Sequence, residues 1–180
     1  ELNAKRLELL KEVFPRIQRV AVLINSGNAS NAWVLEAMDL TAKALKVELR
    51  RFAVRSPSDF ESALAAMTRP RVEALVIRED PLFIAHAGAL AGLASKQRMP
   101  AIGFIEVAEA GGLIAYGVSF PAMFHRAAVF VDKTLKGANP GELPIERATK
   151  FDLAVNMKTA RALGLKFPQS IMLRADRVIE

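Results

Sequence analysis

Short apolar stretches alternate with longer amphipathic ones along the first two thirds of the chain, and this alternation constrains the fold more than any other feature. Val20 to Ile24 is a continuous apolar run followed by turn-forming residues, which is typical of a strand buried on both faces. From Ser30 to Leu45 the apolar residues recur every three or four positions, as in a helix that packs one face on a core. The two patterns predict a strand followed by a helix.

The same pair of patterns recurs downstream. Further strands are predicted at 47–54, 74–77, 101–104 and 113–116, with helices at 60–67, 81–98 and 107–110. The connections are long enough to cross over between parallel strands, and the sequence has no two-residue hairpin turn. We therefore predict an α/β fold with a doubly wound parallel five-stranded sheet, for which the strand order 2-1-3-4-5 is common.

The composition excludes several classes of protein. With 52% hydrophobic residues in 180, the chain can bury a core, so global disorder is not expected. Charged or turn-forming residues interrupt every apolar run before it reaches the length of a membrane span. The chain has no cysteine, which excludes disulfides and zinc–thiolate sites. The basic clusters behind the net charge of +6 lack interleaved aromatics, so we interpret them as solvated and expect no nucleic-acid partner.

The sequence motifs of common enzymes are also missing. No G-x-S-x-G, P-loop or G-x-G-x-x-G follows a predicted strand, so we predict neither catalysis nor a cofactor. His86 and His125 are far apart, and neither has a second ligand at helical spacing, so no metal site is expected. Trp33 lies within the amphipathic pattern of the first crossover helix, and we expect it to be buried.

Polar residues follow the first predicted strand, where doubly wound sheets form a ligand crevice. Asn28, Ser30 and Asn31 precede the first crossover helix. Their side chains and the free N–H groups of a helix start suit a ligand carboxylate. An ordinary N-cap by Ser30 or Asn31 is the alternative.

A second set of candidates follows the other predicted strands. Asp80, and less strongly Glu79, would lie at the facing wall and suit a ligand amine. Alternatively, Asp80 caps the helix that begins with the next proline. Phe104 and Glu106 follow the fourth strand and Tyr116 lies near the end of the fifth, where they would border a planar ligand. Core packing is the favoured role for Phe104.

After Gly117 the alternation stops. A helix from Pro121 to Leu135 precedes a Gly/Pro-rich stretch, one strand from Phe151 to Val155 and short helices. A single strand needs a partner. We therefore expect residues 1–118 to be a ligand-binding lobe and residues 119–180 to be a crossover helix and tail that belong to the other lobe. An unpaired strand would also favour a homodimer or an exchange of tails between chains.

Several long segments of the sequence resemble a single family. They are the helical opening Lys5–Glu12 and the segments Glu109–Gly117, His125–Gly137, Leu143-Pro144, Lys150–Leu153, Asn156–Ala160, Leu163–Leu165 and Arg174–Asp176. These residues resemble the ABC-transporter substrate-binding proteins of the type that includes tryptophan and tyrosine binders. The resemblance implies a type I periplasmic-binding-protein fold with two lobes, in which the segment after Gly117 crosses back to complete the first lobe.

The resemblance also implies a function. The chain would be the solute-binding component of an ABC import system, capturing a small ligand such as an amino acid between two lobes and delivering it to permease subunits outside the cytoplasm, in the periplasm. It would meet the membrane only through the permease or a lipid anchor. In the aromatic amino-acid binders, the loop matching Asn28–Asn31 holds the ligand carboxylate, with its Ser and Asn in the opposite order. In the family, a leader segment and an N-terminal lobe precede the point where this sequence begins.

A second function class shares the fold. The effector-binding domain of a transcription regulator would have the same sheet and would carry a DNA-binding segment upstream. No helix-turn-helix is visible in the sequence.

Overall fold

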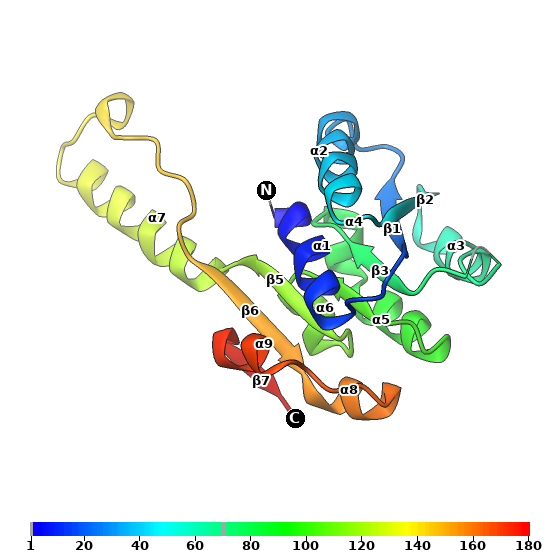
Figure 1. The fold of residues 1–180 in the computed structure, drawn as a ribbon. Helices are drawn as coiled ribbons and strands as arrows, with labels where there is room; N and C mark the ends of the chain where they lie inside the picture. Colours follow the sequence, from blue (N-terminus) through cyan, green and yellow to red (C-terminus); the bar gives the residue numbers. More distant parts are fainter. Residues whose placement is uncertain (1, 70) are drawn as a thin grey trace.

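The computed structural model describes residues 2–69 and 71–180, and within them seven strands form one sheet. The strands lie in the order β2-β1-β3-β4-β5-β6-β7, and neighbours from β2 to β5 are parallel, as predicted (Figure 1). They are β1 (Arg19–Asn25), β2 (Glu48–Val54), β3 (Ala74–Ile77), β4 (Ala101–Gly103), β5 (Ile114–Val118), β6 (Phe151–Asn156) and β7 (Arg177–Ile179).

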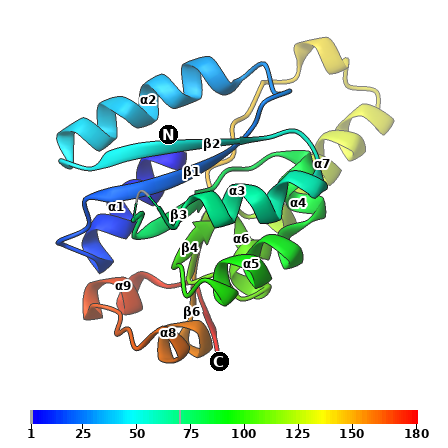
Figure 2. The ribbon, with the colours of Figure 1, turned by 90° about the vertical axis from the view of Figure 1, so that its right-hand side faces the viewer.

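Helices cover both faces of this sheet (Figure 2). Val20 and Val22 of β1 pack in the core shared with α1 and α2, whereas Ala21 and Leu23 pack in the core shared with α3, α4 and α5. Burial on both faces explains why β1 is a continuous apolar run. The helices are α1 (Leu2–Val13), α2 (Asn31–Ala44), α3 (Phe60–Ala66), α4 (Pro81–Ala85), α5 (Ala87–Lys96), α6 (Ile105–Glu109), α7 (Phe120–Leu135), α8 (Met157–Leu163) and α9 (Gln169–Arg174), with 3-10 turns at Pro57–Asp59 and Pro140–Glu142.

Two details of the crossover helices differ from the predictions. The helix expected at 81–98 is divided at His86, which has non-helical backbone angles (φ −122°, ψ 24°). The expected burial of Trp33 is wrong, because its side chain is 67% exposed. The buried stripe of α2 begins at Leu35. Residues two positions apart on a helix are rotated by about 200° about its axis, so they lie on nearly opposite faces. Trp33 therefore faces outward.

The tail strand has a partner in the same chain. β6 pairs antiparallel with β5, from Val118 opposite Phe151 to Ile114 opposite Val155, and β7 pairs parallel with β6. Side chains of β6, α8 and α9 enter the same core as α1. The prediction that this strand needs a second sheet is wrong, because its sequence indicates a strand but not which sheet edge it joins. Because β6 pairs within its own chain, an unpaired strand no longer favours an exchange of tails.

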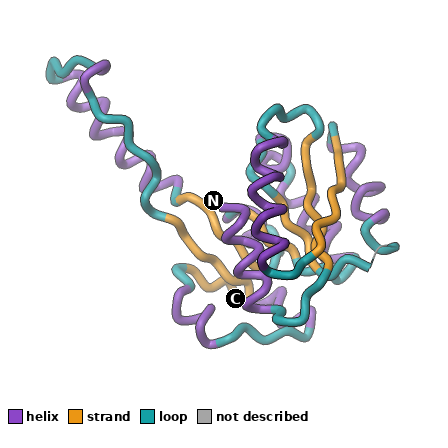
Figure 3. The backbone as a smooth tube through the Cα atoms, turned by 45° about the horizontal axis from the view of Figure 1, so that its top comes forward, coloured by secondary structure: helices purple, strands orange, loops and turns teal. Residues whose placement is uncertain are grey.

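An arm, residues 120–150, extends beyond the end of β5 and the start of β6 and consists of α7 and the returning segment (Figures 1 and 3). α7 has no buried residue. Its apolar side chains Phe124, Val131 and Leu135 are 71%, 57% and 83% exposed. Large apolar side chains exposed along one segment are characteristic of an interaction surface. The arm therefore presents several large apolar side chains to its surroundings.

The attachment of the tail to this sheet can be tested at Asn156. Its buried side chain donates to the carbonyl of Ala108 and accepts from the N–H of Thr159 at the start of α8. We expect Asn156→Ala to lower the free energy of unfolding by about 1–3 kcal/mol in urea denaturation, because a cap and a buried hydrogen bond are both lost. Asn139→Ala, which removes an exposed cap on the arm, should cost less than about 1 kcal/mol. Equal costs for the two variants would contradict this packing.

Candidate ligand-binding site

The loops that follow β1 and β3 meet at the carboxyl edge of the sheet. The side-chain amide of Asn28 donates to Asp80 at 2.8 Å, and that of Asn25 donates to the same carboxylate at 3.0 Å. The sequence predicted that these loops meet, because the carboxyl ends of parallel strands lie on one edge of the sheet. We call the surface that they form, residues 25–31 and 78–80, the mouth. The two loops are in direct contact, and the mouth is densely hydrogen-bonded.

The first turn of α2 opens into this mouth without a side-chain cap. The Ser30 hydroxyl donates to Oδ1 of Asn28 at 2.7 Å and accepts no bond from the helix. Asn31 donates from its side chain to the carbonyl of Asn25 at 2.6 Å. Ser30 occupies the N-cap position, as the alternative interpretation expected, but its side chain forms no capping bond, and Asn31 is the first residue of the helix. The Asn31 N–H donates to the carbonyl of Asn28 at 3.2 Å, whereas the N–H groups of Ala32 and Trp33 have no acceptor among the described residues and are left to water or to a ligand.

Asp80 caps a helix, which was the alternative to binding a ligand amine. It caps α4 by accepting from the N–H of Leu82 at 2.9 Å, and it is 4% exposed. Burial raises the pKa of Asp80, but the hydrogen bonds from Asn28, Asn25 and Leu82 and the charge of Arg78 outweigh burial and lower that pKa overall. The carboxylate is ionised and engaged with three donors, which leaves little capacity for a ligand amine.

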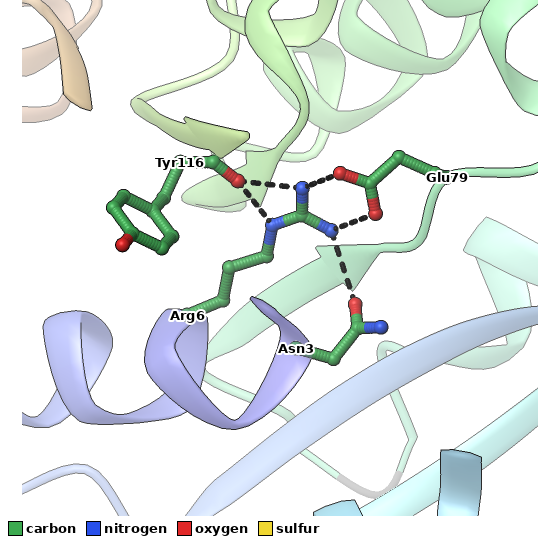
Figure 4. Close-up of polar contacts among 4 residues, drawn as sticks. All are labelled: Asn3, Arg6, Glu79 and Tyr116. Carbon is green, nitrogen blue, oxygen red and sulfur yellow. Dashed lines mark hydrogen bonds and ion pairs between the residues drawn. The ribbon is translucent and has the colours of Figure 1, made fainter. Parts of the chain in front are cut away.

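Glu79 is paired with an arginine that the sequence did not single out. The Arg6 side chain, on α1, is fully buried and donates to both carboxylate oxygens of Glu79 (Figure 4). Arg6 also donates from Nε and Nη2 to the carbonyl of Tyr116, at 2.9 and 2.6 Å, and from Nη1 to Asn3 at 3.0 Å. This cluster joins α1 to the ends of β3 and β5. The pair links positions 73 apart, which no local pattern reveals.

A second buried arginine lies at the end of β3. Arg78 is 5% exposed, and its Nη1 donates to Oδ1 of Asn31 at 2.5 Å. Burial lowers the pKa of Arg78, and the charges of Asp80 and Glu79 act in the opposite direction. Sequence analysis missed this residue, because a charged residue after a strand is most simply interpreted as part of an exposed loop. The position at the carboxyl end of the third strand was the available signal.

The three candidates after the fourth and fifth strands are all at least partly packed within the protein. Phe104 is 2% exposed and packs in the core, which is the role favoured for it. Glu106 is partly buried, and its Oε2 is enclosed without a hydrogen-bond partner among the described residues. The ring of Tyr116 stacks on Phe151, with 5.9 Å between centroids. Tyr116 therefore presents a packed aromatic surface rather than a free side chain.

A depression of about 920 Å³ lies beside the mouth. Trp33 and Val34, in the first turn of α2, line the depression on the side of the mouth. Tyr116 and Phe151 form another part of its wall. Aromatic surface next to a few fixed polar groups is the usual lining of a small-molecule site. No three His, Asp or Glu side chains in residues 2–69 and 71–180 are grouped to hold a metal ion. In the same residues, no helix is long and apolar enough to cross a membrane.

A polar mouth at the carboxyl edge of a doubly wound sheet is the place where proteins of this architecture bind small molecules. The chain belongs to the family described as ABC transporter substrate binding protein, whose family model matches residues 1–179. The resemblance seen in the sequence is thus confirmed.

The chain is similar to three known proteins over most of its length. It is 20% identical over 163 residues to a tyrosine-binding protein of Clostridioides difficile (strain R20291), covering 90% of this chain and 47% of that protein. A conserved domain protein of Vibrio cholerae has a TM-score of 0.87 at 23% identity, covering 98% of this chain and 60% of that one. An ABC domain in complex with L-Trp from Streptococcus pneumoniae also has a TM-score of 0.87, at 22% identity, covering 99% and 62%. The chain spans about half to three fifths of these relatives.

The Arg6 cluster gives the sharpest test of how the mouth is held. Arg6→Met would leave the Glu79 carboxylate and the Tyr116 carbonyl without their donors, and breaking a buried pair costs about 3–5 kcal/mol. Because Glu79 is 28% exposed, we expect a loss of unfolding free energy near 3 kcal/mol, at the lower end of that range. Lys5→Met removes an exposed pair with Glu8 from the same helix and should cost less than about 1 kcal/mol. Urea denaturation in which Arg6→Met costs no more than Lys5→Met would refute this role.

Proposed function

We propose that this chain forms one wall of the ligand site of an ABC-transporter solute-binding protein, and that the solute is a small amphipathic carboxylate such as an amino acid. The observation that carries the proposal is the uncapped first turn of α2, which lies between the Asn28 loop and the depression lined by Trp33. Helix N-termini attract carboxylates because their N–H groups and the helix dipole favour negative charge. Capture requires no chemistry, and none is proposed.

The names of the relatives support this class of solute. One relative is a tyrosine-binding protein and another was solved with L-Trp. Both solutes combine a carboxylate with a planar apolar group. The mouth and the adjoining aromatic depression offer this chain the same two kinds of contact, at Asn28 and Ser30 on one side and at Trp33 and Tyr116 on the other.

We propose further that a second lobe faces this one and that the arm packs against it. The relatives are longer than this chain by a margin that would accommodate another lobe. The exposed apolar side chains of α7 supply a surface for that contact. In this proposal only the arm, which begins just after the boundary expected at residue 118, contacts the other lobe. Residues 151–180 belong to this lobe, because β6 pairs with β5. Hinge closure of the two lobes would enclose the solute and present it to permease subunits outside the cytoplasm.

Calorimetric titration of the intact protein with L-tyrosine, L-tryptophan and the aliphatic amino acids tests the proposal. We expect saturable binding of at least one of them. Asn28→Ala should weaken it by about tenfold, because the loop before α2 loses its bonds to Asp80 and Ser30. Gln18→Ala changes an exposed amide just before β1, at the opposite edge of the sheet, and should leave the affinity unchanged. Absence of binding for every amino acid would contradict an amino acid as the solute, and equal effects of the two substitutions would contradict the proposed site.

A further inference from the structure

Arg78 is a buried cation without a full set of partners. One of its guanidinium nitrogens, Nη1, donates to Asn31, whereas Nε is enclosed and has no hydrogen-bond partner among the described residues. A guanidinium has five N–H donors in a planar fork. Buried donors that stay unpaired cost free energy, and a buried charge costs more. An acceptor group bound beside Arg78 would therefore be stabilised.

The acidic side chains next to Arg78 in the sequence are already engaged. Glu79 accepts bonds at both oxygens from Arg6. Asp80 accepts from two asparagine side chains and one backbone N–H. Neither neighbouring carboxylate therefore accepts a hydrogen bond from the guanidinium of Arg78 in the part of the chain that the structure describes.

The first turn of α2 lies directly beside this guanidinium, because Asn31 is both the first residue of α2 and the partner of Arg78. The guanidinium of Arg78 and the unbonded N–H groups of Ala32 and Trp33 thus place hydrogen-bond donors close together at the carboxyl edge of the sheet. A ligand carboxylate would fit both, whereas a ligand ammonium group would find Glu79 and Asp80 occupied. Such a site favours an anion over a zwitterion.

We propose that Arg78 is an anion-binding residue of this crevice and that it selects solutes with a net negative charge, such as carboxylic acids without a neighbouring ammonium group. The inference rests on the proposed function, because it assumes that a small solute occupies the mouth. The planar fork of arginine matches a carboxylate with two parallel hydrogen bonds. Glu106, with its enclosed and unpaired Oε2, is the competing acceptor for an ammonium group.

Two matched series of solutes test the preference by titration calorimetry on the intact protein. The aromatic series is L-tyrosine, 3-(4-hydroxyphenyl)propanoate and its primary amide, and the aliphatic series is L-leucine, 4-methylpentanoate and its primary amide. Within a series the apolar group is constant; the acid lacks the ammonium group of the amino acid, and the amide replaces the carboxylate with a neutral group. We expect the acid to bind at least about tenfold more tightly than the amide, which loses one charge-assisted contact, and at least about tenfold more tightly than the amino acid, whose ammonium group would find Glu79 and Asp80 already hydrogen-bonded.

Variants of Arg78 separate recognition from folding. Arg78→Gln should weaken binding of the acid about 10- to 100-fold and leave the amide within about twofold. Arg78→Lys keeps the charge but loses the planar fork, so its affinity for the acid should lie between those of the unchanged protein and of Arg78→Gln. Arg55→Gln removes an exposed arginine just after β2 and should change neither affinity. The melting temperature of each variant without solute reports any loss of folding.

The outcomes distinguish this inference from the proposed function. Tighter binding of the amino acid than of the acid, or equal weakening of acid and amide by Arg78→Gln, would overturn the role of Arg78 and leave a solute-binding protein. Failure of every solute in both series to bind would overturn the proposed function as well. A selective loss of the acid in Arg78→Gln, with partial recovery in Arg78→Lys, would establish the inference.

Discussion

One buried guanidinium holds together the sheet edge on which the candidate site depends. Arg6 makes five hydrogen bonds, two of them to Glu79 and two to the carbonyl of Tyr116. A buried charge is tolerated only when it is paired and hydrogen-bonded. The cluster therefore fixes α1 against the ends of β3 and β5, close to where the arm departs after β5. It also removes Glu79 from the groups available to a ligand.

The rest of the mouth follows from the same requirement. Asp80 is ionised, and it organises both loops by accepting from Asn25, Asn28 and the first turn of α4. The carboxylates beside Arg78 are thus hydrogen-bonded within the protein, and in our proposal the donors at Arg78 and at the start of α2 bind the solute. A surface with hydrogen-bond donors next to an aromatic depression suits an acidic amphipathic molecule. The family of ABC transporter substrate binding proteins supplies the biological setting for such a surface.

Local patterns predicted the parallel strands, their order and the meeting of the loops near Asn28 and Asp80, because burial on two faces leaves a clear mark on the sequence. They failed where a partner lies far along the chain. The strand at Phe151 was recognised but its pairing with β5 was not, and the Arg6–Glu79 pair spans positions that no periodicity connects. Trp33 was misplaced because α2 carries apolar residues outside its buried stripe. Arg78 was overlooked because burial of a charge cannot be inferred from composition.

The central claim is that the solute lies at the carboxyl edge of the sheet, with its acidic group between Arg78 and the first turn of α2. A crystal structure of the intact protein with its tightest-binding solute tests this most directly. The account predicts an acid oxygen within about 3 Å of both the Arg78 guanidinium and a backbone N–H of that turn. A solute bound away from this edge, or one whose acidic group faces Glu106 while Arg78 stays unoccupied, would contradict it.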